Sequence, residues 1–139
     1  MRLFLDTSVL LAASGSAGGA SREIFHRASA NGWILIATPY GLEEVLRNLP
    51  TLAPSASADW AALRPALLIM DDVLTVDRPA VFPIAKDRPI LFSALAWADI
   101  LLTLDKDDFG RFMDKPFYGL LVFRPGVFLR RERAAGRLR

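Results

Sequence analysis

Residues 1–13, MRLFLDTSVLLAA, consist of a short apolar run, one aspartate and a second apolar run. We expect residues 3–5 to form a buried strand and a helix to begin after Asp6. A charged side chain between apolar segments is costly to bury unless it finds partners. Three explanations of Asp6 are open at this point: an interrupted secretion signal, a helix cap, or one part of a site assembled from distant carboxylates.

The secretion signal is the weakest of these explanations. Arg2, the apolar run and the small residues that follow imitate a signal peptide, but Asp6 interrupts the apolar segment, and its charge opposes membrane insertion. No segment reaches the roughly 18 consecutive apolar residues of a membrane-spanning helix. The chain has no cysteine, which excludes a disulfide framework and suits a reducing compartment. We therefore expect a cytoplasmic protein that does not bind membranes.

Length and charge predict one domain with a basic end. A chain of 139 residues, 53% of them hydrophobic, can bury about two thirds of its surface in one core. The last ten residues hold five arginines and one glutamate, whereas residues 1–129 are mildly acidic. We expect a folded domain over 1–129 and a basic tail over 130–139. The tail could attract nucleic acid or an acidic partner, or be a solvated end or helical extension.

Apolar runs of strand length alternate with segments of helical length along the chain. We expect strands at 3–5, 33–37, 73–76, 100–104 and 120–123, and helices after Asp6 and at 21–30, 40–48, 60–70, 90–98 and 107–113. Ser21 is expected to cap the second helix, and Pro65 to break or kink the one at 60–70. This order predicts an α/β fold: a single domain with a mostly parallel central sheet flanked by helices on both faces, in three layers.

Acidic residues follow the predicted strands. Asp6 follows the first strand and Asp105 follows the strand at 100–104, while Glu43 and Glu44 lie early in the helix after the second strand. Asp87 stands just before the helix predicted at 90–98. Ligands of parallel sheets gather beyond the carboxyl ends of the strands. Each acid also has an ordinary explanation, as a helix cap, a turn residue or a solvated helix position.

Several carboxylates at one sheet edge would raise one another's pKa values unless a cation lay among them. Magnesium is commonly held by a few carboxylates and water, so a metal site and a set of caps are both open. Other metals fit less well. One histidine and no cysteine cannot supply the usual zinc ligands. The segment DKDDFG, residues 105–110, resembles the start of a calcium loop, which needs oxygen ligands at its fifth and twelfth positions. Phe109 and Pro116 occupy those positions, so a calcium loop is excluded. The three tryptophans, Trp33, Trp60 and Trp97, are expected in the core.

Four stretches together resemble the PIN-domain family of metal-dependent ribonucleases, which includes the VapC-type toxins of toxin–antitoxin pairs. They are LDTSVLLAA, TPYGLEEVLRNL, KDRPILFSALAWADILLTLDKDDF and LLVFRPGVFL, and they cover nearly the whole chain in order. The third is the most specific, because an acidic residue opens a helix that leads into a strand ending T-x-D-x-x-D-F. One departure is the tight AWAD turn, where the family often has a glycine. It leaves Asp99 unassigned.

The resemblance implies a PIN-like fold with four metal-holding catalytic acids, Asp6, Glu44, Asp87 and Asp105. Glu44 is preferred to Glu43 because the family's acid directly precedes an apolar residue. Side chains that could support the site are Thr7, Ser8, Thr103, Asp107 and Asp108. Basic side chains that could contact phosphates, and that are otherwise ordinary surface charges, are Lys86, Arg88, Lys106 and Arg111.

The chemistry implied is hydrolysis of RNA phosphodiester bonds with Mg²⁺ or Mn²⁺, which would activate a water and offset the charge on the phosphate. RNA as the substrate follows from the family, as do a cognate antitoxin and a homodimer if the chain is a toxin. The alternative is a catalytically silent PIN-like module that binds RNA or protein. A dehalogenase-type phosphotransferase is disfavoured, because Ser8 stands where its D-x-D motif needs a second aspartate.

Overall fold

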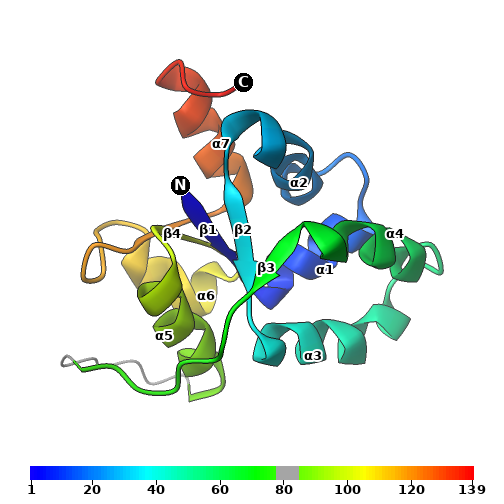
Figure 1. Cartoon of the computed structure of the whole chain (residues 1–139), viewed down its shortest axis with the longest axis horizontal. Coiled ribbons are helices and arrows are strands. Elements are labelled where there is room, and N and C mark those ends of the chain that lie inside the picture. Colours follow the sequence, from blue (N-terminus) through cyan, green and yellow to red (C-terminus); the bar gives the residue numbers. More distant parts are fainter. Residues whose placement is uncertain (78–84) are drawn as a thin grey trace.

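The computed structural model describes residues 1–77 and 85–139 (Figure 1). Within these residues five parallel strands form one sheet in the order β3-β2-β1-β4-β5. The strands are β1 (Arg2–Leu5), β2 (Ile34–Ala37), β3 (Leu67–Ile69), β4 (Ile100–Leu102) and β5 (Leu121–Phe123). The chain builds outward from β1 to one edge of the sheet and then crosses back to build the other half beside β1.

Seven helices accompany the strands in the described part of the chain. They are α1 (Thr7–Gly15) and α2 (Ala20–Asn31) between β1 and β2, α3 (Pro39–Asn48) and α4 (Ala56–Leu63) between β2 and β3, α5 (Arg88–Trp97) before β4, α6 (Lys106–Phe109) before β5, and α7 (Pro125–Ala134) after it. Short 3-10 turns lie at Leu49–Thr51, Arg64–Ala66, Ala85–Asp87 and Gly110–Phe112. The predicted α/β class with a parallel sheet is confirmed.

Alternate strand residues supply two apolar layers. Leu3 and Leu5 of β1 pack on one face with side chains from α1, α2, α4 and α7, whereas Phe4 packs on the other face with side chains from α5 and α6. These three side chains are at most 1% exposed. A sheet covered on both faces needs apolar residues at every position. That requirement explains why the strands are continuous apolar runs in the sequence.

The ends of β1 and β4 are fixed side by side. Leu5 pairs with Leu102, and the backbone N–H of Asp6 donates to the Leu102 carbonyl at 3.0 Å. The N–H of Thr103 in turn donates to the Phe123 carbonyl at 3.0 Å. The sheet reverses its direction of growth between β1 and β4. Beyond the carboxyl ends of strands, such a reversal creates the crevice where α/β proteins bind ligands.

Three local expectations are wrong. Helix α4 ends at Leu63, a 3-10 turn through Pro65 follows, and residues 67–69 form the edge strand β3 rather than the end of a helix. Residues 73–76 form no strand. Ser21 does not cap α2, because Gly19 occupies the cap position and Ser21 is buried in the first turn. A proline inside a helix removes a backbone hydrogen bond, which accounts for the break at Pro65.

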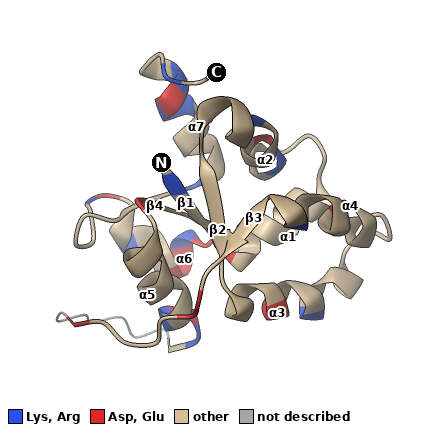
Figure 2. Ribbon diagram, viewed as in Figure 1, with Lys and Arg blue, Asp and Glu red and all other residues tan. Residues whose placement is uncertain are grey.

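The arginine-rich end continues the fold. Helix α7 crosses from residue 129 into the predicted tail and packs against α2, and the ribbon at this end of the chain carries arginine positions, blue in Figure 2. Glu132 is buried and accepts two hydrogen bonds from Arg137, at 2.7 and 2.9 Å, which hold the pKa of Glu132 below its usual value. The N–H of Arg139 donates to Asn31 at 2.8 Å. Of the alternatives for the tail, the helical extension is observed.

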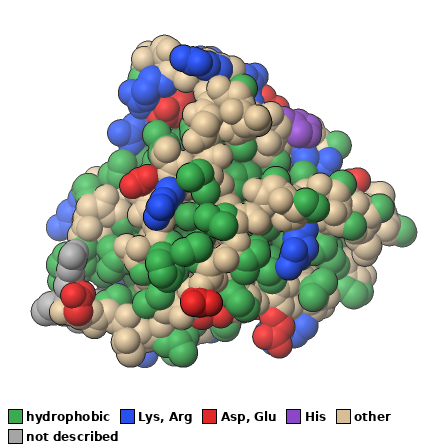
Figure 3. Space-filling model, viewed as in Figure 1, with side chains coloured by type: hydrophobic (Ala, Val, Ile, Leu, Met, Phe, Trp, Pro, Cys, Tyr) green, Lys and Arg blue, Asp and Glu red, His purple; other side chains and the backbone are tan. Residues whose placement is uncertain are grey.

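Apolar side chains also reach the surface. Leu46 on α3 and Leu68 on β3 are 61% and 46% exposed, and Figure 3 shows hydrophobic side chains gathered on the face of the molecule that carries β3 and α5. Among the described residues, no helix is long and apolar enough to cross a membrane.

Candidate metal centre

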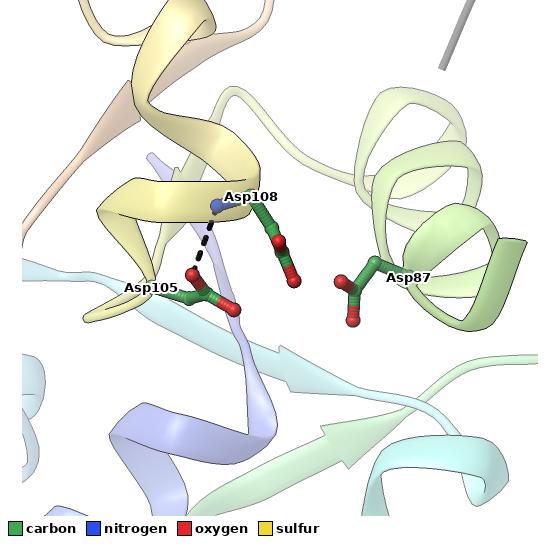
Figure 4. A group of neighbouring side chains, drawn as sticks. All are labelled: Asp87, Asp105 and Asp108. Carbon is green, nitrogen blue, oxygen red and sulfur yellow. Dashed lines mark hydrogen bonds between the residues drawn. The ribbon is translucent and has the colours of Figure 1, made fainter. Parts of the chain in front are cut away.

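The segment after β4 presents two carboxylates on one side. Asp105 occupies the cap position of α6, and its Oδ1 accepts the backbone N–H of Asp108 at 3.0 Å. The N–H of Asp105 donates to the Thr103 hydroxyl at 3.0 Å. The hydrogen bond between Asp108 and Asp105 holds this turn together, and the side chain of Asp108 lies alongside that of Asp105 (Figure 4).

Asp87 reaches the same place from a different element. It ends the 3-10 turn before α5 and makes no side-chain hydrogen bond to that helix, so the helix cap, one of its two explanations, is not observed. Its carboxylate points instead toward Asp108 and Asp105 (Figure 4). Each of the three offers an oxygen within 4.8 Å of the others. In an octahedral Mg²⁺ site, adjacent ligand oxygens lie about 3.0 Å apart and opposite ones about 4.2 Å, so the three side chains would have to move closer together to hold one ion.

The three-acid cluster, Asp87, Asp105 and Asp108, is electrostatically strained. Burial, followed by the hydrogen bond and charge of Asp108, raises the pKa of Asp87 to about 7. The same hydrogen bond lowers the pKa of Asp108. Among the described residues, Oδ2 of Asp87 is buried without a hydrogen-bond partner. A buried polar atom without a partner is destabilising, and hard carboxylate oxygens suit a divalent ion. The residues therefore fit a metal ion.

Asp6 lies beside the cluster, more deeply buried, and only 6% exposed. It accepts the N–H of Thr7 at 2.7 Å and the hydroxyls of Ser8 and Thr103 at 2.9 and 2.8 Å. Burial raises the pKa of Asp6 against these hydrogen bonds, and the charge of Asp105 raises it further. Asp6 is thus both the predicted cap of α1 and a carboxylate within electrostatic reach of the cluster.

Helix α3 contributes the remaining predicted acid and a tyrosine that sequence reasoning missed. Burial, then the charge of Glu44, raises the pKa of Tyr40 to about 12, with a smaller contribution from Asp87. The Tyr40 hydroxyl donates to the carbonyl of Lys86. Tyr40 therefore lies between Glu44 and the cluster. Its spacing of four residues from Glu44 places both on one helical face, and that spacing was the available signal.

The other predicted acids lie apart from the cluster. Glu44 is outside the three-acid group, and Glu43 is exposed and pairs with Arg47 at 4.0 Å. Asp107 is exposed, so Asp108 is the acid that the α6 turn directs toward the ion site. Asp99 lies at the opposite end of the sheet, where its Oδ2 accepts the N–H of Arg2 at 2.8 Å.

Of the predicted basic residues, Lys86 lies nearest the acids, with Nζ 3.9 Å from Asp108. The Arg111 guanidinium stacks over Phe112, 4.7 Å from the ring centre. Arg88 and Lys106 are exposed at the starts of α5 and α6.

Two buried threonine hydroxyls lie just beyond the ends of strands, and the sequence did not indicate that they would lack partners. Oγ1 of Thr7 and of Thr38 are buried and have no hydrogen-bond partner among the described residues. They follow β1 and β2 at the edge that carries the acids. Buried hydroxyls of this kind usually bond an ordered water or a ligand.

No protein-family model matches the chain, and no curated protein matches it. The case for a site therefore rests on the geometry of the carboxylates and on their chemistry.

Proposed function

We propose that the chain is a metal-dependent endoribonuclease of the PIN type, with Mg²⁺ or Mn²⁺ held by the three-acid cluster. The observation that carries the proposal is the meeting of three carboxylates from two separate segments where the sheet reverses its direction of growth, with a buried, unpartnered oxygen on Asp87. Two of these acids, Asp87 and Asp105, are also acids that the sequence resemblance selects. Of the other two, Asp6 acts on Asp87 through its charge, whereas Glu44 lies outside the three-acid group.

The side chains have separable tasks in this proposal. A bound divalent ion would lower the pKa of a water and offset negative charge on the phosphate. Asp105 and Asp108 present oxygens from one rigid turn, because their positions are linked by a hydrogen bond. Asp87 must give up the proton that it holds near neutral pH before it can bind a cation. Asp6, held by three hydrogen bonds, is a further carboxylate within electrostatic reach of Asp87 and Asp105.

RNA is the proposed substrate, and this part rests on the sequence resemblance. A toxin with a cognate antitoxin and a homodimeric state are the more specific forms of the same proposal. Lys86, next to Asp108, is the predicted phosphate contact that the geometry favours.

Cleavage of labelled single-stranded RNA in Mn²⁺, in Mg²⁺ and in EDTA tests the proposal. The informative variant is Asp105→Asn, because asparagine keeps an oxygen to accept the N–H of Asp108 and so preserves the turn. The matched control is Asp107→Asn, the same change two residues away on an exposed side chain. We expect Asp105→Asn to lose about 100-fold or more of the metal-dependent activity, and Asp107→Asn to retain it.

Equal metal-dependent cleavage by wild type and Asp105→Asn would contradict the proposal. Equal cleavage that resists EDTA would indicate a contaminating nuclease. RNA that is bound but uncut, by protein shown to hold Mn²⁺, would support the silent binding module instead.

A further inference from the structure

A pocket lined by two arginines opens at the carboxyl edge of the sheet. Its volume is about 210 Å³, and its walls come from the start of α7, the first residue of α2 and the residue before Asp105. The lining residues are Ala20, Leu104, Arg124, Gly126, Val127 and Arg130. No carboxylate lines it.

Leu104, which lines this pocket, links it to the acids. It directly precedes Asp105, and its N–H donates to the Ser8 hydroxyl at 3.1 Å, which itself donates to Asp6. Arg124 follows β5 as Thr103 follows β4, and these two strands pair in parallel. The pocket and the three-acid cluster therefore open on neighbouring positions of one edge.

The two arginines of the pocket are not neutralised within the described residues. Other arginines of the chain pair with acids, as Arg22 does with Asp59 at 3.0 Å and Arg137 with Glu132 at 2.7 Å. Neither Arg124 nor Arg130 forms such a pair with any residue that the structure describes.

The side chain of Arg130 also turns back along its helix. Its Nη1 lies 3.7 Å from the position that a Cβ would take on Gly126. Arg130 and Arg124 thus both line the pocket, and Arg130 lies beside Gly126, which lines it too.

We propose that this pocket binds a backbone phosphate of the same RNA strand that is cut at the acids. The proposal deepens the proposed function and rests on it. Guanidinium groups bind phosphate oxygens through paired hydrogen bonds. A cluster of carboxylates repels a polyanion, so a strand that reaches it needs positive charge close by. A phosphate held by Arg124 and Arg130, in a pocket lined by the residue that precedes Asp105, would fix the register of the strand relative to the ion.

Binding of a labelled single-stranded RNA 12-mer, measured by fluorescence anisotropy in EDTA so that the RNA stays intact, tests the pocket. Arg130→Gln and Arg124→Gln each remove one pocket charge. The matched control is Arg133→Gln, the same charge change on the same helix but outside the pocket. For each pocket variant we expect the slope of log K against log [salt] to fall by about 0.7, the value for one phosphate contact on a single strand. The control should leave the slope nearly unchanged.

A neutral methylphosphonate placed at one RNA position at a time locates the contact. With the wild-type protein, a methylphosphonate at one RNA position should weaken binding more than at the others. With Arg130→Gln the methylphosphonate at that position should no longer have this extra effect, because two groups in contact give non-additive changes in binding free energy. Equal salt slopes for Arg130→Gln and Arg133→Gln would overturn the proposal. The same methylphosphonate profile for wild type and Arg130→Gln would also overturn it.

The two proposals fail in different ways. If the RNA responds to the pocket arginines but is never cut in Mn²⁺, the nuclease proposal fails. If cutting depends on Asp105 while Arg130→Gln behaves like Arg133→Gln, the pocket proposal fails alone.

Discussion

Replacing Asp87 by asparagine should stabilise the ion-free protein at pH 8 and change its stability little at pH 4. The pKa of Asp87 is raised from an ordinary 3.8 to about 7. A carboxyl group with a raised pKa in the folded state stabilises the protein fully at low pH, and this contribution is lost as the pH rises toward 7. Asparagine cannot ionise, so the variant should not show the loss.

The expected size follows from the pKa. A shift of about three units would correspond to roughly 4 kcal/mol at most. Because Asp87 is half-buried and water screens its charge, we expect about 1–2 kcal/mol at pH 8. For a chain of this length that change raises Tm by about 3–8 °C.

Thermal unfolding in EDTA at pH 4, 6 and 8 measures this effect, with Asp107→Asn as the matched control on an exposed acid. The stability gain of Asp87→Asn should grow from pH 4 to pH 7 and then level off. Added Mn²⁺ should raise the Tm of wild type, since a ligand that binds only the folded state stabilises it, and should raise that of the variant much less. Destabilisation of equal size at all three pH values would mean that the charge of Asp87 does not affect stability and that Asp87 is an ordinary helix-start residue.

Three further predictions concern the same network and the end of the chain. Mn²⁺ affinity, measured by titration calorimetry, should fall by about tenfold per pH unit below pH 7, because one proton competes with the ion at Asp87; a flat profile from pH 7 to 5 would contradict this. Asp6→Asn should lower the free energy of unfolding in urea by about 1–3 kcal/mol, since one oxygen that accepts two hydroxyl hydrogen bonds is lost; an unchanged midpoint would contradict it. Glu132→Gln should destabilise the protein at pH 7 by weakening the pair with Arg137, and the difference should shrink as the pH falls, because the lowered pKa of Glu132 stabilises only while that group is ionised. A difference that persists at pH 3 would contradict this last prediction.

The proximity of Asp6 and Asp105 was predictable from the sequence. Both follow continuous apolar strands, and parallel strands that neighbour each other bring their carboxyl ends together. The charge of Asp105 does raise the pKa of Asp6. The end of α4 at Leu63 and the strand β3 after it were not predictable in the same way. Pro65 marked a break, but the three residues that follow it could not be distinguished from a buried helix segment by periodicity.

The sequence could not show which acids form the three-acid cluster, because that depends on the directions in which their side chains point. Asp107 and Asp108 are adjacent in one helical turn, and neighbouring helix positions point in different directions. The hydrogen bond from the N–H of Asp108 to Asp105 decides which of them faces Asp87. The sequence also placed Asp87 at a helix start, where a cap was the simpler expectation. Tyr40 was missed because its only signal was the four-residue spacing from Glu44, which places both side chains on one helical face.

The most direct measurement of the central claim is the position of Mn²⁺ in a crystal, determined by anomalous diffraction. We expect a peak between Asp87, Asp105 and Asp108, about 2.2 Å from an oxygen of each. The peak should be absent in crystals of Asp105→Asn that are soaked in the same way. If no peak lies at the cluster at a Mn²⁺ concentration that supports RNA cleavage, or if the peak lies at other side chains, the three acids are not the metal centre.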